Sequence, residues 1–282
     1  MLVLPVPRHL PVERRSLSGP LRDVRAITFD FGNTLVPVAA ATLRAVVART
    51  AEQVAERLGG FPADEFLRIW SEERERQFRE EVPEMREVDL AQRLVRVLAR
   101  LRGMRAPDVG ARWDDAAAAT RSQRGEVEWG VDAYSLAFVD LVPAPADVGP
   151  MLERLARHHE LAILSNWPLA ATIDRFVEAA GWSKSFRAIV VSQRVGTIKP
   201  DPRIFAVTAA ALGDPAPAAI LHVGDDWAAD VVGAKRVGWR AAYLVRRPGD
   251  SPLPTSERDT DGVSADLEIE TLADLEAAVP VS

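Results

Sequence analysis

The sequence of 282 residues contains no cysteine and only three lysines among its 35 basic residues. Without cysteine the chain can form no disulfide, no thiolate metal site and no thiol nucleophile, so any catalytic nucleophile must be an oxygen or a nitrogen. It also has no run of about 18 apolar residues, the length that a membrane-spanning helix requires. We therefore expect no membrane segment.

The charge and composition are those of an ordinary globular protein. Hydrophobic residues make up 48% of the chain, charged residues 27%, and the formal net charge is -6. No basic cluster interleaved with aromatic residues is present, which argues against nucleic-acid binding. Three prolines interrupt the first 11 residues, so residues 1–20 do not resemble a secretory signal and are predicted to be a flexible extension. We expect a cytoplasmic protein, while its oligomeric state is not indicated.

Short runs of apolar and β-branched residues alternate with helical patterns over much of the chain. The predicted strands are residues 24–29, 161–164, 188–191, 219–223 and 241–245, with a last strand and helix within 266–278. The predicted helices between them are 148–158, 169–180, 202–212 and 228–237. This alternation predicts an α/β fold with a doubly wound, Rossmann-like parallel sheet. Ligands of such sheets bind at the carboxyl ends of the strands.

The alternation is interrupted once, between residues 37 and 143, where we find helical periodicity and no convincing strand. Candidate helices in this region are 39–58, 63–79, 89–101 and 107–119. The sequence therefore predicts an inserted α-helical cap at 37–143 and a core formed by 21–36 and 144–282.

Polar residues that could take part in catalysis or ligand binding follow the predicted strands in four segments. They are Asp30-Phe31-Gly32-Asn33-Thr34-Leu35, then Ser165-Asn166-Trp167, then Gly196 to Pro200 with Lys199, and Gly224-Asp225-Asp226 with Asp230. In order they supply a carboxylate, a hydroxyl, an amine and a cluster of carboxylates. Because arginine is the usual cation of this chain, a lysine at position 199 indicates a need for a compact ammonium.

These four segments and the helical insert after the first resemble the haloacid dehalogenase superfamily, from about residue 24 onward. The resemblance implies a Mg²⁺-dependent hydrolase in which Asp30 attacks phosphorus and forms an aspartyl-phosphate. Thr34 and Ser165 would hydrogen-bond the phosphoryl oxygens, and Lys199 would neutralise them. The expected partner is a small phosphorylated substrate.

Hard oxygen ligands suit the implied Mg²⁺ ion. The predicted ligands are the carboxylates of Asp30, Asp225 and Asp230 and the backbone carbonyl of Gly32, although Asp230 can instead pair with Lys199. The predicted substrate-binding residues are Gly32, Asn33, Asn166 and Trp167.

Three further residues near these segments each permit two interpretations. Asp226 either takes part in the site or caps the following helix. His222 is more often a buried, hydrogen-bonded histidine than a catalytic one in such a strand. Trp227, like Trp167, lines the substrate pocket or packs beneath the cap.

Position 32 departs from the phosphatases of this superfamily, which carry a second Asp there as general acid and base. Gly32 cannot transfer a proton, and the loss of such a group typically costs ~10²–10⁴-fold in rate. An enzyme with a specialised substrate is our first hypothesis, and Gly32→Asp is expected to increase hydrolysis. A non-catalytic protein that binds a phosphorylated ligand or a protein partner is the second.

Two other enzyme classes are less compatible with the sequence. Dehalogenating relatives place a Tyr at position 32 and need no metal, whereas this chain has Gly32 and a metal-ready Asp225. Haloacid dehalogenase is therefore the third hypothesis. Phosphonate-cleaving relatives use a cap lysine, and residues 1–183 contain none.

Overall fold

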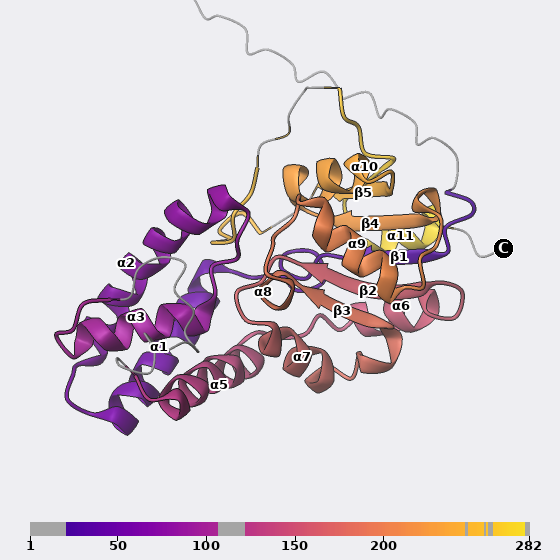
Figure 1. The fold of residues 1–282 in the computed structure, drawn as a ribbon. Helices are drawn as coiled ribbons and strands as arrows, with labels where there is room; N and C mark the ends of the chain where they lie inside the picture. Colours follow the sequence, from indigo (N-terminus) through magenta and orange to yellow (C-terminus); the bar gives the residue numbers. More distant parts are fainter. Residues whose placement is uncertain (1–20, 107–121, 246–247, 257, 259–261, 280–282) are drawn as a thin grey trace, which may run out of the picture.

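A computed structural model describes residues 21–106, 122–245, 248–256, 258 and 262–279 (Figure 1). The predicted extension at 1–20 and the predicted helix at 107–119 lie outside the described residues. In the described part of the chain, no helix combines the length and apolarity needed to cross a bilayer.

Six strands form one parallel sheet in the order β3-β2-β1-β4-β5-β6. They are β1 (Ala26–Phe29), β2 (Glu160–Ser165), β3 (Ala188–Val191), β4 (Ile220–Gly224), β5 (Arg240–Leu244) and β6 (Leu267–Ile269). The predicted strands are confirmed, with ends shifted by one or two residues. Because β1 and β4 are central neighbours with Phe29 opposite Val223, the residues that follow them emerge side by side.

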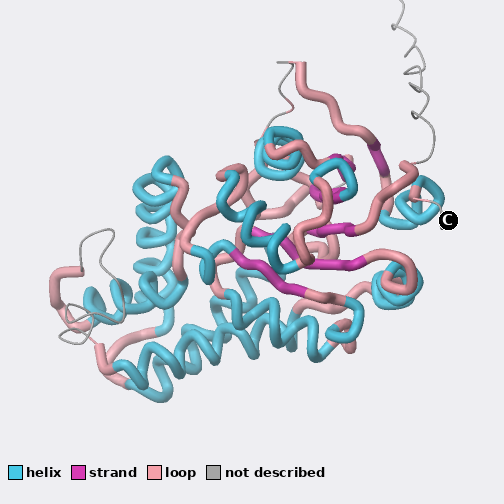
Figure 2. Tube along the Cα trace, turned by 45° about the vertical axis from the view of Figure 1, so that its right-hand side comes forward, coloured by secondary structure: helices cyan, strands magenta, loops and turns pink. Residues whose placement is uncertain are grey.

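Helices cover both faces of this sheet, which confirms the doubly wound α/β fold (Figure 2). They are α6 (Val148–Leu155), α7 (Ala170–Ala179), α8 (Ser192–Val195), α9 (Pro202–Ala211), a π-helical segment (Trp227–Val232), α10 (Gly233–Arg236) and α11 (Leu272–Ala278). Alternate residues of β1 point to opposite faces. Ile27 and Phe29 join the core that contains α6, α7 and α11, and Ala26 joins the core that contains α9 and α10.

Among the described residues, four helices lie between β1 and α6, and they are grouped to the left of the sheet in Figure 1. They are α1 (Ala40–Leu58), α2 (Ala63–Glu81), α3 (Leu90–Leu101) and α5 (Arg124–Leu141), and we call them the helical insert. A 3₁₀ turn, Val82–Glu84, follows α2. No strand is found among the described residues of this region, as predicted. The sequence did not predict α5, which packs against α1 and α7 and so joins the insert to the core.

An aromatic cluster fills the junction between α5 and the core. Phe138 of α5 lies 5.5 Å from Trp167 and 6.0 Å from Phe176 between ring centroids, and Phe31 lies 5.4 Å from each of the latter two. All four rings are buried. Edge-to-face contacts of this kind add to the free energy gained by burying each ring. The loop after β1 is therefore held against the insert by packing.

We predict that Phe138→Ala lowers the free energy of unfolding by about 3–5 kcal/mol, since it opens a cavity among three aromatic neighbours. Leu136→Ala on the same helix is the control, because Leu136 is 57% exposed and its loss should cost less than about 0.5 kcal/mol. Chemical denaturation of both variants measures the difference. Equal effects would contradict the packing role of Phe138.

Candidate active site

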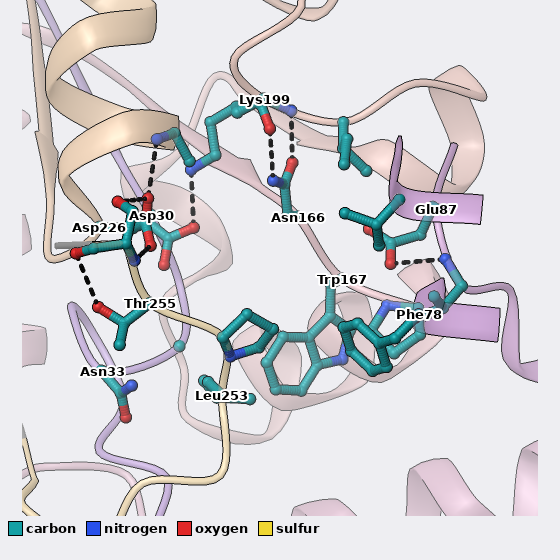
Figure 3. A pocket seen from close by; sticks show the side chains of 18 of the residues that line it. Asp30, Asn33, Phe78, Glu87, Asn166, Trp167, Lys199, Asp226, Leu253 and Thr255 are labelled. Carbon is teal, nitrogen blue, oxygen red and sulfur yellow. Dashed lines mark hydrogen bonds and ion pairs between the residues drawn. The ribbon is translucent and has the colours of Figure 1, made fainter. Parts of the chain in front are cut away.

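The four predicted segments come together at the carboxyl ends of β1, β2 and β4, around a pocket of about 410 Å³ (Figure 3). Eight of the predicted residues line it: Asp30, Gly32, Asn33, Asn166, Trp167, Lys199, Asp225 and Asp230. Thr34 and Ser165 are buried nearby. Trp227 does not line the pocket, and instead packs edge-on against Tyr243 in the second core.

Lys199 is the centre of the site and is 2% exposed. Its ammonium donates to Oδ1 of Asp30 at 2.8 Å, to Oδ1 of Asp230 at 2.6 Å and to the carbonyl of Leu164 at 2.8 Å. Because an ammonium has three N–H groups, these bonds use all of its donors. The predicted pairing of Asp230 with Lys199 is thus confirmed.

Asp230 is held by two more donors. His222 donates from Nε2 to Oδ1 at 3.0 Å, and the backbone N–H of Asp226 donates to Oδ2 at 2.9 Å. His222 is fully buried with Thr28 at 2.8 Å from Nδ1, which confirms it as a buried, hydrogen-bonded histidine. Since the protein itself engages both oxygens of Asp230, its assignment as a direct metal ligand stays a prediction.

Gly224 gives Asp230 the room that it needs. A Cβ atom at position 224 would lie 2.1 Å from Oδ2 of Asp230, so any side chain here would displace that carboxylate. The π-helical segment begins at Trp227, between Gly224 and Asp230, whereas the sequence predicted an ordinary helix over 228–237. Asp226 accepts from the N–H of Ala229 at 2.8 Å, which confirms it as the helix cap.

The ionisation of this buried cluster follows from its contacts. Burial and, to a smaller extent, the nearby charge of Asp230 raise the pKa of Asp30 to about 6, although Lys199 opposes the shift. The pKa of Asp230 is lowered despite burial, because Lys199 and His222 stabilise its charge. The pKa of Lys199 is raised, since the two carboxylates outweigh its burial. The ammonium is therefore shared unequally, with Asp230 as the better-stabilised anion.

Two hydroxyls and one amide surround this cluster. Ser165 Oγ is buried without a hydrogen bond of normal geometry to the described residues, although its proximity lowers the pKa of Asp30 slightly. Thr34 donates to Oδ1 of Asp225 at 3.3 Å. Asn166 accepts from the backbone N–H of Lys199 at 2.7 Å and donates to its carbonyl at 3.0 Å. Asn166 therefore fixes the Lys199 backbone, and a role in substrate binding stays a prediction.

Residues 249–256, which we call the covering loop, line one side of the pocket with Leu253, Pro254, Thr255 and Ser256, of which Figure 3 labels Leu253 and Thr255. Asn33 adopts a positive φ of 61° and donates to the hydroxyl of Ser251 at 2.9 Å. Asp226 accepts from the N–H of Ser256 at 2.7 Å. These bonds attach the loop to the segments after β1 and β4.

The covering loop occupies the side-chain space of position 32. A Cβ atom on Gly32 would lie 2.5 Å from Cδ1 of Leu253 and 3.0 Å from Cζ3 of Trp167. Gly32 is not among the residues with positive φ, so its backbone would accept a side chain. The obstacle to an acid at this position is therefore the apolar contact with Leu253 and Trp167. No signal in the sequence indicated Leu253.

The oxygen donors present fit a magnesium ion. Asp30 and Asp225 line the same pocket with Gly32, whose backbone carbonyl stays a predicted ligand. Within the described ranges, no group of three or more His, Asp or Glu side chains is placed to hold a metal. Mg²⁺ typically takes only one or two carboxylates and keeps several waters, so it does not require such a group. Two carboxylates, Asp30 and Asp230, share the single ammonium of Lys199, which leaves negative charge for a cation to offset.

The raised pKa of Asp30 predicts a pH-dependent stability. Between the unperturbed value of 3.8 and about 6 the folded protein binds this proton more tightly than the unfolded chain does. The free energy of unfolding therefore falls by up to about 3 kcal/mol as pH rises through that window, and Asp30→Asn removes this fall. Denaturation in chelator from about pH 4 to pH 7 measures it.

Asp201→Asn is the control for this experiment. The pKa of Asp201 is lowered to about 2, mainly by its hydrogen bond from Arg203, so its contribution to stability is lost only below about pH 4. The profile of this variant should run parallel to that of the wild type over the measured range. A parallel profile for Asp30→Asn as well would contradict the burial of an ionisable Asp30.

Known proteins that resemble this chain identify its family. The family model for haloacid dehalogenase-like hydrolases matches residues 24–238. A haloacid dehalogenase-like hydrolase domain-containing protein 3 of Bos taurus is 34% identical over 101 residues, which are 36% of this chain and 38% of that protein. A phosphoserine phosphatase of Thermus thermophilus is 36% identical over 102 residues, 36% of this chain and 40% of that protein. The matches thus span about two fifths of the length of these relatives.

A solved structure shows the same fold over most of the chain. The 2-haloacid dehalogenase of Pseudomonas syringae superposes with a TM-score of 0.62 at 23% identity, and the match covers 90% of this chain and 97% of that protein. The family model covers the strands β1 to β4 and all four motif segments. The chain belongs to the haloacid dehalogenase-like hydrolases.

Proposed function

We propose that this chain is a Mg²⁺-dependent phosphatase that cleaves a small phosphate ester through an aspartyl-phosphate on Asp30. The observation that carries the proposal is the Lys199 ammonium, fixed between Asp30 and Asp230 beside the carboxylate of Asp225. The similarity to a phosphoserine phosphatase supports it. The helical insert acts as the cap, because residues of α2, α3 and α5 line the same pocket as Asp30.

Each residue of the site has a separate role in the proposed reaction. Lys199 binds Oδ1 of Asp30, which leaves Oδ2 to attack phosphorus. The unsatisfied hydroxyl of Ser165 then gains a hydrogen-bond partner in a phosphoryl oxygen, so the energetic cost of burying that hydroxyl is recovered when substrate binds. Thr34 holds Asp225 in place. A Mg²⁺ ion on Asp30, Asp225 and the Gly32 carbonyl would offset the repulsion between Asp30 and a phosphate dianion.

The apolar surroundings of Gly32 restrict the substrate. Gly32 has no side chain that could protonate the oxygen that leaves phosphorus, and Leu253 and Trp167 lie in the space where a side chain would begin. The ester must therefore have a weakly basic leaving oxygen, such as that of a phenol. The same observation favours the second candidate, a protein that binds a phosphorylated ligand without cleaving it.

Hydrolysis of a panel of aryl and alkyl phosphates with Mg²⁺ tests the proposal. Asp30→Asn should abolish turnover and keep the fold, since it removes the nucleophile but conserves its shape. Asp225→Ala should weaken Mg²⁺ binding measured by calorimetry, because a hard oxygen ligand is lost. Binding of esters without turnover would favour the non-catalytic protein. Unchanged rates in chelator would favour a metal-free dehalogenase.

The contact between positions 32 and 253 predicts that an acid at position 32 works only when Leu253 is trimmed. Gly32→Asp alone should give no gain, because the new side chain meets Leu253. The double variant Gly32→Asp/Leu253→Ala should hydrolyse an alkyl phosphate up to ~10²–10⁴-fold faster than the wild type. The gain for an activated aryl phosphate should be smaller, since its leaving oxygen needs little protonation.

Leu253→Ala alone is the control, and it should leave kcat/KM on the alkyl ester within a few-fold of the wild type. The quantity compared is kcat/KM of each variant on both esters. If Gly32→Asp alone is as active as the double variant, Leu253 does not limit this position. If neither changes the rate in a folded protein that binds Mg²⁺, the missing acid is not what limits turnover.

A further inference from the structure

The pocket continues from the phosphoryl site into the helical insert. Figure 3 shows Asp30 and Glu87 at opposite ends, with Trp167 and Phe78 between them. The part near Glu87 is lined by Phe78, Val82, Val88, Arg93 and Tyr134. A volume of about 410 Å³ is within the range of sites that enclose a whole small molecule. The leaving group of the substrate therefore has a binding site of its own.

Arg93 is a buried cation held in one orientation at this end. It is 4% exposed, its Nε donates to Oε1 of Gln77 at 2.8 Å, and its guanidinium lies 5.2 Å from the ring centroid of Trp70. Gln77 is itself fixed by a bond of 2.9 Å to the carbonyl of Asp89. Because both neighbours are buried, little conformational entropy remains for Arg93 to lose when a ligand binds.

The terminal nitrogens of Arg93 have no anionic partner among the described residues. Two carboxylates act on Arg93 from a distance, but each is hydrogen-bonded elsewhere. Glu87 accepts from the N–H of Val88 and the hydroxyl of Ser192, and Asp89 accepts from the N–H of Gln92 and the amide of Gln193. A buried charge without a paired counter-ion is costly, and a ligand anion would offset that cost.

Two other polar side chains line the pocket with Arg93. Tyr134 stacks on Trp70, the ring that Arg93 also contacts, with ring centroids 6.1 Å apart. The Tyr134 hydroxyl makes no hydrogen bond to the described residues. Arg74 lies 4.7 Å over the ring of Phe78 and donates to the carbonyl of Pro252 at 3.2 Å. The far end of the pocket thus presents two guanidinium groups and a phenol around aromatic walls.

We propose that Arg93, together with Tyr134 and Arg74, binds an anionic group at the end of the leaving group. The substrate is then a phosphate ester with a compact apolar or aromatic middle and a second anion, either a carboxylate or a phosphate. This inference rests on the proposed phosphatase function for the position of the first phosphate. Arg93 determines specificity and takes no part in breaking the bond.

A matched set of aryl phosphates tests the site. Phenyl phosphate is compared with 4-carboxyphenyl, 4-(carboxymethyl)phenyl and 4-(2-carboxyethyl)phenyl phosphate, which place the carboxylate at increasing distance. We expect at least one carboxylate ester to have a kcat/KM about 10-fold or more above that of phenyl phosphate, as a charged hydrogen bond typically provides. A bisphosphate, 4-(phosphonooxy)phenyl phosphate, distinguishes a phosphate from a carboxylate as the preferred anion.

Three variants locate the effect. Arg93→Gln should lose the preference for the anionic esters, measured as the ratio of their kcat/KM to that of phenyl phosphate on the same variant, while Arg93→Lys should retain part of this preference. Tyr134→Phe keeps the stacked ring and should lower the preference several-fold. Arg79→Gln on α2 is the control of equal charge, because Arg79 is exposed and outside the pocket. Melting temperatures show whether each variant is folded.

Binding without turnover separates this inference from the proposed function. Calorimetry compares 4-(phosphonomethyl)benzoate with benzylphosphonate, neither of which can be hydrolysed. If no ester is cleaved but the benzoate binds more tightly only when Arg93 is present, the anion site stands and the phosphatase proposal fails. If esters are cleaved but none of the anionic esters is preferred over phenyl phosphate, the anion site is overturned. A preference for 4-(aminomethyl)phenyl phosphate would also overturn it, in favour of Glu87.

Discussion

The shared ammonium of Lys199 is the interaction on which the rest of the site depends. It links Asp30 after β1, Leu164 in β2 and Asp230 after β4, and thus ties together three neighbouring strands of the sheet. Because the group is almost fully buried, removing the charge of Lys199 would leave Asp230 without compensation, which typically costs about 3–5 kcal/mol. Two neighbouring residues keep the Lys199 cluster in this arrangement. The amide of Asn166 fixes the backbone of Lys199, and the lack of a side chain at Gly224 leaves space for Asp230.

The sequence predicted this centre well because its signals are local. Strands β1 and β4 are short, mainly apolar runs followed directly by an aspartate, so the carboxyl-end position of Asp30 and Asp225 follows from the pattern alone. The scarcity of lysine singled out Lys199, which the structure places at the centre of the cluster. By contrast, α5 was missed because its apolar residues do not form one stripe. They face α1 on one side and α7 on another, which removes the periodicity that marks a surface helix.

What the sequence could not predict is contact between distant segments. Asn33 and Ser251 are 218 positions apart, and no pattern near either residue indicates that they are hydrogen-bonded. In the sequence, Gly32 therefore reads as the loss of an acid, whereas in the structure it is one side of a close apolar contact with Leu253. The two positions have to be understood together. A side chain at position 32 would require the Leu253 side chain to move from its present position.

The contact with Leu253 also bears on the leaving group of the phosphatase reaction that we propose. An alkoxide that departs beside Leu253 and Trp167 would develop its charge in apolar surroundings with no donor at position 32, which raises the barrier. A phenolate spreads the same charge over its ring and needs far less protonation. An aromatic leaving group also matches the walls formed by Phe78, Trp167 and Tyr134. For the proposed phosphatase, the apolar contacts of Leu253 and Trp167 and the aromatic lining of the insert both favour an aryl ester. The proposed anion site at Arg93 would then select among such esters by what they carry at the far end of the ring.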